Sequence, residues 1–131
     1  MILKTKFVER KDLKRINNWL VGWKLNKLPL GMYPTTGLIL YNEEDGEEIY
    51  SGFVFMSNSQ MAQVGFITRN PYYKKKIKPN VRKEFIVWLV DYAKELGYKH
   101  IISWAENKFL VGDFKDLGFS ETSNSVSELI L

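Results

Sequence analysis

The stretch from Val81 to Phe119, VRKEFIVWLVDYAKELGYKHIISWAENKFLVGDFKDLGF, predicts a helix, a strand and a second helix in succession. Its first part carries apolar residues at helical spacing on most sides, which is typical of a helix buried against a sheet. The segment HIISWA then predicts a strand, and residues 108–117 return to helical spacing. We expect this strand to lie parallel to the strand that precedes the first helix, through a right-handed crossover.

The boundaries of the first of these helices carry their own signals. Asn80 is the expected N-cap, and Gly97 is the expected glycine after the last turn. Trp88 and Trp104 are both expected in the core. The apolar face of the helix is expected to comprise Val81, Phe85, Trp88, Leu89, Tyr92 and Leu96, extended by Ile86, Val90 and Ala93.

The N-terminal half predicts a strand, a helix and a loop. Residues 3–8 alternate as in a strand, and Asp12 can cap a helix that ends before Pro29. Residues 25–37 contain prolines and glycines without a clear period, which is typical of a loop with at most a turn of helix. The helix should bury one face, made of Leu13, Ile16, Leu20 and Trp23.

The middle of the chain predicts an antiparallel meander. Two β-rich runs flank Asp45 and Gly46, a residue pair suited to a hairpin turn, and a third run covers residues 60–68. Phe119 and residues 126–131 can supply a final strand pair, whose exposed edge could join two copies of the chain. Both a monomer and a homodimer therefore stay open.

The composition limits the class of protein. With 131 residues, 45% of them hydrophobic, the chain is expected to form a single domain, residues 1–131. The absence of cysteine and the presence of one histidine, His100, argue against a metal site. We expect a cytoplasmic protein, because no segment is typical of a signal peptide or a membrane span.

The net charge of +4 favours an anionic partner, and the segment NPYYKKKIKPNVR at residues 70–82 concentrates that charge. It precedes the N-terminus of the long helix, where free N–H groups attract anions. This segment can be a phosphate cradle or a solvated basic loop. Nucleic-acid binding is a third possibility, because Tyr72 and Tyr73 could stack on bases beside Lys74, Lys75 and Lys76.

The order of these elements resembles the GCN5-related N-acetyltransferase (GNAT) family over almost the whole chain. Three strings carry the resemblance: AQVGFITRNP, which is similar to the strand along the cofactor, YAKELGYKHI, and ENKFLVGDFKDLGFSE. The last is the most specific, since its asparagine stands twelve residues before the phenylalanine of Leu-Gly-Phe. The resemblance implies an α/β (α+β) acyl-CoA N-acyltransferase fold, with a mixed, mostly antiparallel sheet, a central parallel β-α-β unit and flanking helices.

The resemblance also implies a site for acetyl-CoA between two parallel strands that separate near Thr68 and Ser103. Main-chain groups of the strand at residues 64–68 would bind the pantetheine arm, and the turn at residues 78–82 would hold the pyrophosphate. Asn107 would bind the arm from the other side. Tyr33 would face the acceptor, and Glu106 is the candidate base. The expected cofactor-binding residues are Phe66, Ile67, Thr68, Lys78, Asn80, Val81, Arg82, Asn107 and Phe114.

Three positions depart from the family pattern. The turn reads IKPNVR and has no glycine, where small residues normally let the backbone approach a phosphate. Phe114 stands where many members have a tyrosine that protonates the leaving thiolate, and Gln63 stands where a glutamate often acts as base. Neither phenylalanine nor glutamine can do that chemistry.

Two functions therefore stay open. The first is an enzyme that transfers an acetyl group from acetyl-CoA to an amine of a small molecule or a protein by direct attack. The second is a catalytically degenerate protein of the same fold that binds coenzyme A or a macromolecule. The sequence does not identify the acceptor.

Overall fold

One mixed sheet organises the chain in the computed structural model, which describes residues 1–105, 107–123, 127, 129 and 131. Its strand order is β1-β2-β3-β4-β5, with β1 to β4 antiparallel and β5 parallel to β4. The expected meander and parallel crossover are confirmed. The strands are β1 (Leu3–Phe7), β2 (Gly37–Asn42), β3 (Glu48–Phe55), β4 (Met61–Arg69) and β5 (His100–Ile102).

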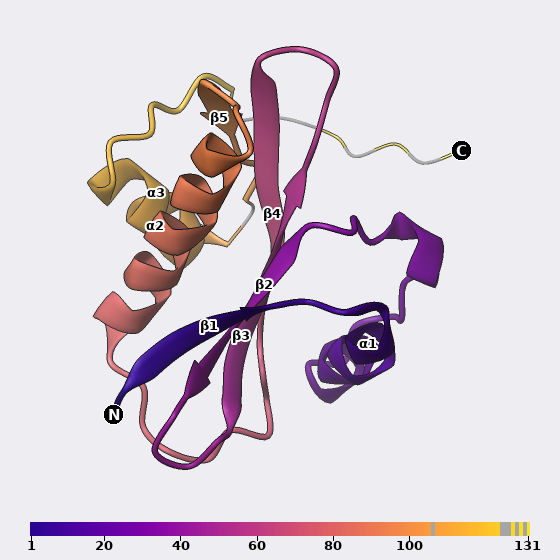
Figure 1. The fold of residues 1–131 in the computed structure, drawn as a ribbon, viewed down its shortest axis with the longest axis vertical. Helices are drawn as coiled ribbons and strands as arrows, with labels where there is room; N and C mark the ends of the chain where they lie inside the picture. Colours follow the sequence, from indigo (N-terminus) through magenta and orange to yellow (C-terminus); the bar gives the residue numbers. More distant parts are fainter. Residues whose placement is uncertain (106, 124–126, 128, 130) are drawn as a thin grey trace.

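Helices cover both faces of the sheet (Figure 1). α1 (Leu13–Gly22) lies on one face, and α2 (Pro79–Glu95) and α3 (Lys108–Asp116) lie on the other. Short 3₁₀ turns occupy Arg10–Asp12 and Leu30–Met32, the second within the expected loop. No helix in the described part of the chain is long and apolar enough to cross a membrane.

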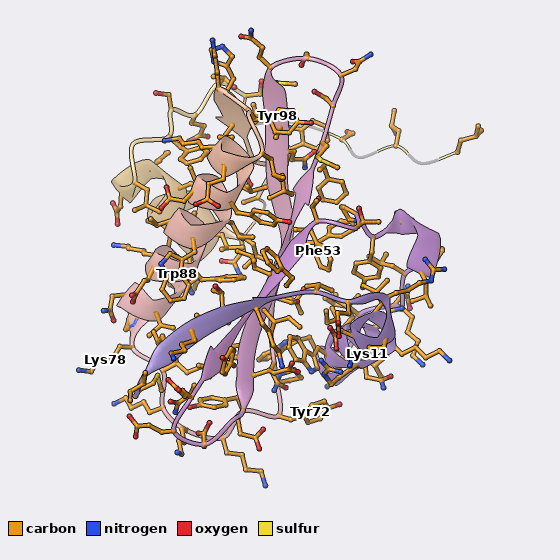
Figure 2. The ribbon with its side chains drawn as sticks, viewed as in Figure 1. Lys11, Phe53, Tyr72, Lys78, Trp88 and Tyr98 are labelled. Carbon is orange, nitrogen blue, oxygen red and sulfur yellow. The ribbon has the colours of Figure 1, made fainter. Side chains whose placement is uncertain are left out.

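The larger of two apolar cores lies between the sheet and α2. Phe85, Ile86 and Leu89 are fully buried, and Trp88 packs at the margin of this core (Figure 2). Each fully buried side chain of this size contributes about 1.5–3 kcal/mol by leaving water. A smaller core, on the α1 side, contains Ile16 and Phe53. The buried face expected for the long helix is confirmed at its centre.

The sequence prediction was wrong at the start of α2 and right at its end. The helix begins at Pro79 with Lys78 as N-cap, so the N-cap expected at Asn80 was wrong. Proline fits the first helical position, because its fixed φ is helical and its missing N–H is not needed there. Gly97 has φ of 100°, and its N–H bonds the Lys94 carbonyl at 2.9 Å, which confirms the expected helix end.

Several other predictions were wrong. The Asp12 side chain does not cap α1, because it accepts the N–H of Glu9 at 2.8 Å instead. Trp23 and Trp104 were expected to be buried, but they are 47% and 70% exposed. Phe119 is not in a strand, and the strand expected at residues 126–131 falls largely outside the described residues.

The last turn of α1 places a lysine in a conformation that favours glycine. Lys24 has φ of 61°, and its N–H bonds the Val21 carbonyl at 2.9 Å, as in a glycine-type helix end. We expect Lys24→Gly to raise the free energy of unfolding by roughly 0.5–1 kcal/mol, because glycine adopts this conformation without a steric penalty. Urea unfolding would measure the change.

Gly97 provides the opposite control for that measurement. It has the same sign of φ but no neighbouring atom within 4 Å of an added Cβ, so Gly97→Ala tests backbone strain alone. We expect this variant to be less stable by about 1 kcal/mol. A Lys24→Gly protein that is no more stable than the parent would contradict the first expectation.

Candidate functional site

The strands β4 and β5 separate early. Only Met61–Gln63 pairs with His100–Ile102, whereas β4 continues to Arg69. The ladder ends where the Ser103 hydroxyl donates to the Val64 carbonyl at 2.8 Å. Beyond Val64, this edge of β4 has no neighbouring strand among the described residues. The sequence analysis predicted the separation near Thr68 and Ser103. The prediction is confirmed on β5, but on β4 the strands separate at Val64, four residues before Thr68.

A bulge in β4 follows directly after this point. Ser51 pairs with Thr68 but Phe53 pairs with Gly65, so β4 carries one more residue than β3 over this interval. Phe66 has φ of 51°, the left-handed conformation that a bulge can require. The bulge takes peptide groups of β4 out of the regular ladder, in the segment whose main chain was expected to bind a ligand.

The residues of the bulge point to opposite faces of the sheet. The Phe66 ring lies 5.7 Å from the Tyr33 ring and 5.0 Å from the Phe55 ring, on the α1 side. Ile67 packs against the core under α2. The Thr68 hydroxyl donates to the Phe66 carbonyl at 3.3 Å. Binding of a cofactor by Phe66, Ile67 and Thr68 stays a prediction that depends on their main chain.

The N-terminus of α2 offers fewer amide donors than a glycine-rich turn. Pro79 has no N–H, and the Val81 N–H donates to the Lys78 carbonyl at 3.1 Å. The Val81 side chain is buried in the core, whereas Lys78 and Asn80 are exposed. A phosphate at this helix end would therefore depend on side chains more than on peptide groups.

Arg82 is bound to an acidic residue of α3. Its Nε donates to Asp113 Oδ2, and its guanidinium lies 6.0 Å from the centre of the Phe109 ring. The Asp113 hydrogen bond raises the pKa of Arg82 against the opposing effect of burial. Because Asp113 is 5% exposed, its carboxylate would be left buried and unpaired if Arg82 turned away. Arg82 thus fastens α2 to α3.

Asn107 begins α3. Its side-chain oxygen accepts the Phe109 N–H at 2.8 Å, and its carbonyl accepts the Val111 N–H at 3.0 Å. The cap uses the oxygen of the Asn107 amide and leaves the amide nitrogen available as a donor. Glu106, the candidate base, lies outside the described residues.

Phe114 and Tyr33 are both largely buried. Phe114 is 6% exposed and packs at 4.9 Å against Phe119. The Tyr33 hydroxyl donates to Asn17 Oδ1 at 2.6 Å, and burial raises the pKa of Tyr33. A role for Phe114 beside a cofactor, or for Tyr33 in holding an acceptor, is not tested by these positions and stays a prediction.

The basic segment after β4 is not a continuous binding surface. Tyr73 is buried, with its hydroxyl 3.3 Å from the Asn42 amide nitrogen, so the expectation that it stacks on bases was wrong. Lys75 pairs with Asp45 at 2.9 Å. Tyr72, by contrast, is 60% exposed. Lys74 and Lys76 are exposed as well.

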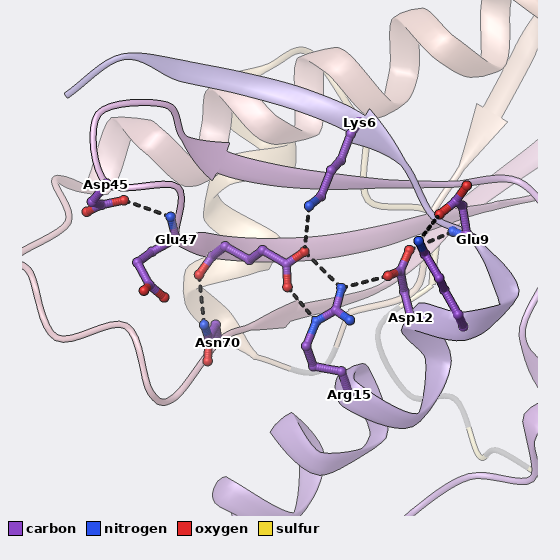
Figure 3. Close-up of polar contacts among 9 residues, drawn as sticks. Lys6, Glu9, Asp12, Arg15, Asp45, Glu47 and Asn70 are labelled. Atoms are coloured by element: carbon purple, nitrogen blue, oxygen red, sulfur yellow. Dashed lines mark hydrogen bonds and ion pairs between the residues drawn. The ribbon is translucent and has the colours of Figure 1, made fainter.

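A cavity of about 640 Å³ lies on the α1 face, away from the opening at β4 and β5. Ion pairs hold its wall together (Figure 3): Arg15 donates to both oxygens of Glu48, at 2.6 and 2.9 Å, and to Asp12 at 2.8 Å. Lys6 reaches Glu48 at 3.0 Å. Two carboxylates thus face two cations, and the network connects α1 to β1 and β3.

Sequence reasoning missed this network. Arg15 and Glu48 are far apart in the chain, and no local spacing relates them. The only signal in the sequence is that Glu48 opens a β-rich run, where a charge needs a partner or an edge position.

No protein-family model matches the chain, and no curated protein matches it in sequence. Solved structures do match. An acetyltransferase from Trypanosoma brucei has a TM-score of 0.66 and 14% identity, over 98% of this chain and 99% of that one. The ribosomal-protein-S18-alanine N-acetyltransferase from Escherichia coli has a TM-score of 0.72 and 14% identity, over 93% and 80%.

N-acetylglutamate synthase from Neisseria gonorrhoeae, solved with coenzyme A and N-acetyl-glutamate, has a TM-score of 0.72 and 12% identity, over 94% of this chain and 29% of that one. These likenesses cover nearly all of the present chain. The chain therefore has the GNAT acyl-CoA N-acyltransferase fold, as the sequence resemblance implied. Its sequence is divergent from those of the structures that share the fold.

The ion-pair network gives a prediction about stability. Burial opposes ionisation of Asp12, but the Glu9 N–H and the Arg15 guanidinium outweigh burial and lower the pKa of Asp12. We expect Asp12→Asn to reduce the free energy of unfolding at pH 7 by about 1–3 kcal/mol, because Arg15 loses a charged acceptor. Denaturant unfolding at several pH values would measure this loss.

The sign of the pH dependence follows from the lowered pKa. The stabilisation from Asp12 is fully present above the pKa of an unfolded aspartate, about 3.9, and disappears as the pH falls through the folded value. The difference between parent and Asp12→Asn should therefore shrink in acid. Glu43→Gln is the control, because its pair with Lys4 is exposed and should contribute less than about 1 kcal/mol. A pH-independent difference would contradict the prediction.

Proposed function

We propose that this chain binds acetyl-CoA in the opening between β4 and β5 and transfers its acetyl group to an amine. One observation supports this most: the β4–β5 ladder ends at Gln63 and Ile102, while β4 runs on to Arg69. Unpaired peptide groups at a strand edge can bind an extended chain of amides. The pantetheine arm of coenzyme A is such a chain.

The remaining parts of the cofactor have partial matches in this chain. The amide nitrogen of Asn107 is available to donate to the arm from the α3 side, because only its oxygen is used in the cap. The pyrophosphate would lie at the start of α2, beside the exposed Lys78 and Asn80. Pro79 and Val81 weaken this end of the site, since neither supplies a free N–H.

In the proposed reaction the acceptor nitrogen attacks the carbonyl carbon of the thioester, a C–N bond forms and the C–S bond breaks. The amine gives up one proton and the departing thiolate takes one up. Phe114 has no hydroxyl, so water would have to supply the proton to the thiolate. Glu106 is the proposed base. The acceptor can be a small molecule or a protein.

The binding part of this proposal is tested by thermal unfolding with coenzyme A and with acetyl-CoA. A ligand that binds the folded state alone stabilises it, by about 2.7 kcal/mol when its concentration is 100 times Kd. We expect both compounds to raise the Tm of the parent. No shift with either compound at millimolar concentration would overturn the proposal.

Asn107 allows a matched pair of variants. Asn107→Ser keeps a good N-cap but removes the amide nitrogen, whereas Asn107→Ala removes both. We expect both variants to bind coenzyme A several-fold more weakly by calorimetry, and only Asn107→Ala to lose about 1 kcal/mol of stability. Parent-like affinity in Asn107→Ser would remove Asn107 from the site.

A second candidate function, binding of the coenzyme without catalysis, is supported by two features. Phe114 and Gln63 both lack the groups for proton transfer. Thiol release from acetyl-CoA in the presence of a panel of amines separates the two functions. Amine-dependent release supports the enzyme. A Tm shift without release from any amine supports the binding protein.

A further inference from the structure

Acidic residues are absent from two long stretches of this chain. Residues 13–42 contain no Asp or Glu but four Lys and Arg residues, and residues 49–83 contain no Asp or Glu but seven. A random distribution of the 15 acidic residues would place several in each stretch. Where the two stretches touch in the fold, neither contributes an acidic side chain, although Glu47 and Glu48 line the cavity that Tyr72 also lines.

They touch where the end of α1 meets the loop after β4. An added Cβ on Gly22 would lie 2.5 Å from Pro71 Cγ and 3.1 Å from the Tyr72 hydroxyl oxygen, so only glycine permits this approach. The indole N–H of Trp23 donates to the Arg69 carbonyl at 2.8 Å. The contact therefore brings Trp23, next to Gly22, and Tyr72, next to Pro71, into the same part of the surface.

Both aromatic rings at this contact are exposed, Trp23 by 47% and Tyr72 by 60%. Tyr72 stands out below α1 (Figure 2). The Trp23 ring is oriented by its indole hydrogen bond to Arg69, and the Tyr72 main chain is held by the bond from its N–H to Asn70 Oδ1 at 2.9 Å. Adjacent exposed rings, unlike single ones, are typical of an interaction surface.

Exposed cations are neighbours of these rings in the chain. Lys24 follows Trp23, Lys74 is two residues after Tyr72, and Arg69, whose carbonyl accepts the Trp23 indole N–H, ends β4. No ion pair joins them to another described residue, in contrast to Lys75, which pairs with Asp45. We call Trp23, Lys24, Arg69, Tyr72 and Lys74 the aromatic–basic patch. It lies on the α1 side of the loop, apart from the opening between β4 and β5.

We propose that the aromatic–basic patch binds single-stranded nucleic acid. Exposed Trp and Tyr rings stack on unpaired bases, and Lys and Arg side chains around them neutralise the phosphates. An acidic protein would satisfy the cations but leaves the two exposed rings unexplained. A duplex presents phosphates without exposed base faces. The combination of rings and cations favours a single strand.

Fluorescence anisotropy with labelled oligo-dT and oligo-U of about 15 nucleotides tests this proposal. We expect binding by the parent to weaken steeply with salt, because phosphate contacts release counterions. Tyr72→Ala and Trp23→Ala should each weaken binding about five-fold or more at constant salt, from the loss of base stacking. Lys74→Gln should weaken binding and reduce the salt slope by about one.

Matched controls exist elsewhere on the chain. Trp104 is 70% exposed and Lys99 is exposed, and both lie near β5, away from the patch. Trp104→Ala and Lys99→Gln should bind as the parent does. Glu47 lines the same cavity as Tyr72, so its negative charge should oppose the binding of a nucleic acid. Glu47→Gln should therefore bind the oligonucleotide more tightly at low salt. Thermal unfolding checks that Trp23→Ala is folded, and Tyr72→Ala carries the test if it is not.

Several results would overturn the proposal. They are the absence of oligonucleotide binding at low salt, equal affinity for a duplex of the same length, and unchanged affinity in Tyr72→Ala. Binding to anionic lipid vesicles without binding to oligonucleotides would identify a membrane surface instead. Because coenzyme A binding is measured separately, failure here leaves the proposed acetyl transfer unaffected, and the reverse also holds.

Discussion

The hydrogen bond from Ser103 to the Val64 carbonyl marks the constraint on which the functional interpretation depends. Up to that point β4 and β5 satisfy each other's peptide groups, and beyond it β4 has a neighbour on one side only. Peptide groups cannot be left both buried and unpaired without a large cost. The bulge at Phe66 lies directly beyond that point, and a ligand with its own amides is a natural partner for the unpaired edge.

Features that depend on neighbouring residues could be predicted from the sequence. The hairpin turn at Asp45 and Gly46, the helix end at Gly97 and the buried face of α2 each have a short-range signal, and each is confirmed. Features that depend on distant residues could not. Nothing near Arg82 in the sequence indicates Asp113, and nothing near Arg15 indicates Glu48. For the same reason Tyr73, which was considered for base stacking, is buried, and Trp104, which was expected in the core, is exposed.

The candidate site contains one feature that could be predicted from the sequence and one that could not. The separation near Ser103 was predicted, although the strand expected over HIISWA, residues 100–105, ends at Ile102. The departure point on β4 could not be predicted, since it depends on the bulge, and the bulge depends on packing of Phe66 among Tyr33, Phe53 and Phe55. A site built from main-chain groups would leave little trace in the identity of its residues, and the structures that share this fold are only 12–15% identical to the chain.

The basic segment between β4 and α2 connects the two proposed surfaces. A turn that cradles a phosphate with its backbone needs glycines, and here Pro79 and the bonded Val81 N–H have removed much of that capacity. The segment nevertheless carries a high positive charge, and its basic residues have different surroundings in the fold. Lys78 and Asn80 lie at the start of α2, Lys75 pairs with Asp45, and Arg69 and Tyr72 lie where the segment meets α1. A pyrophosphate at the start of α2 would not account for the exposed Trp23 and Tyr72 rings, so the second side of the segment is better explained by a different ligand.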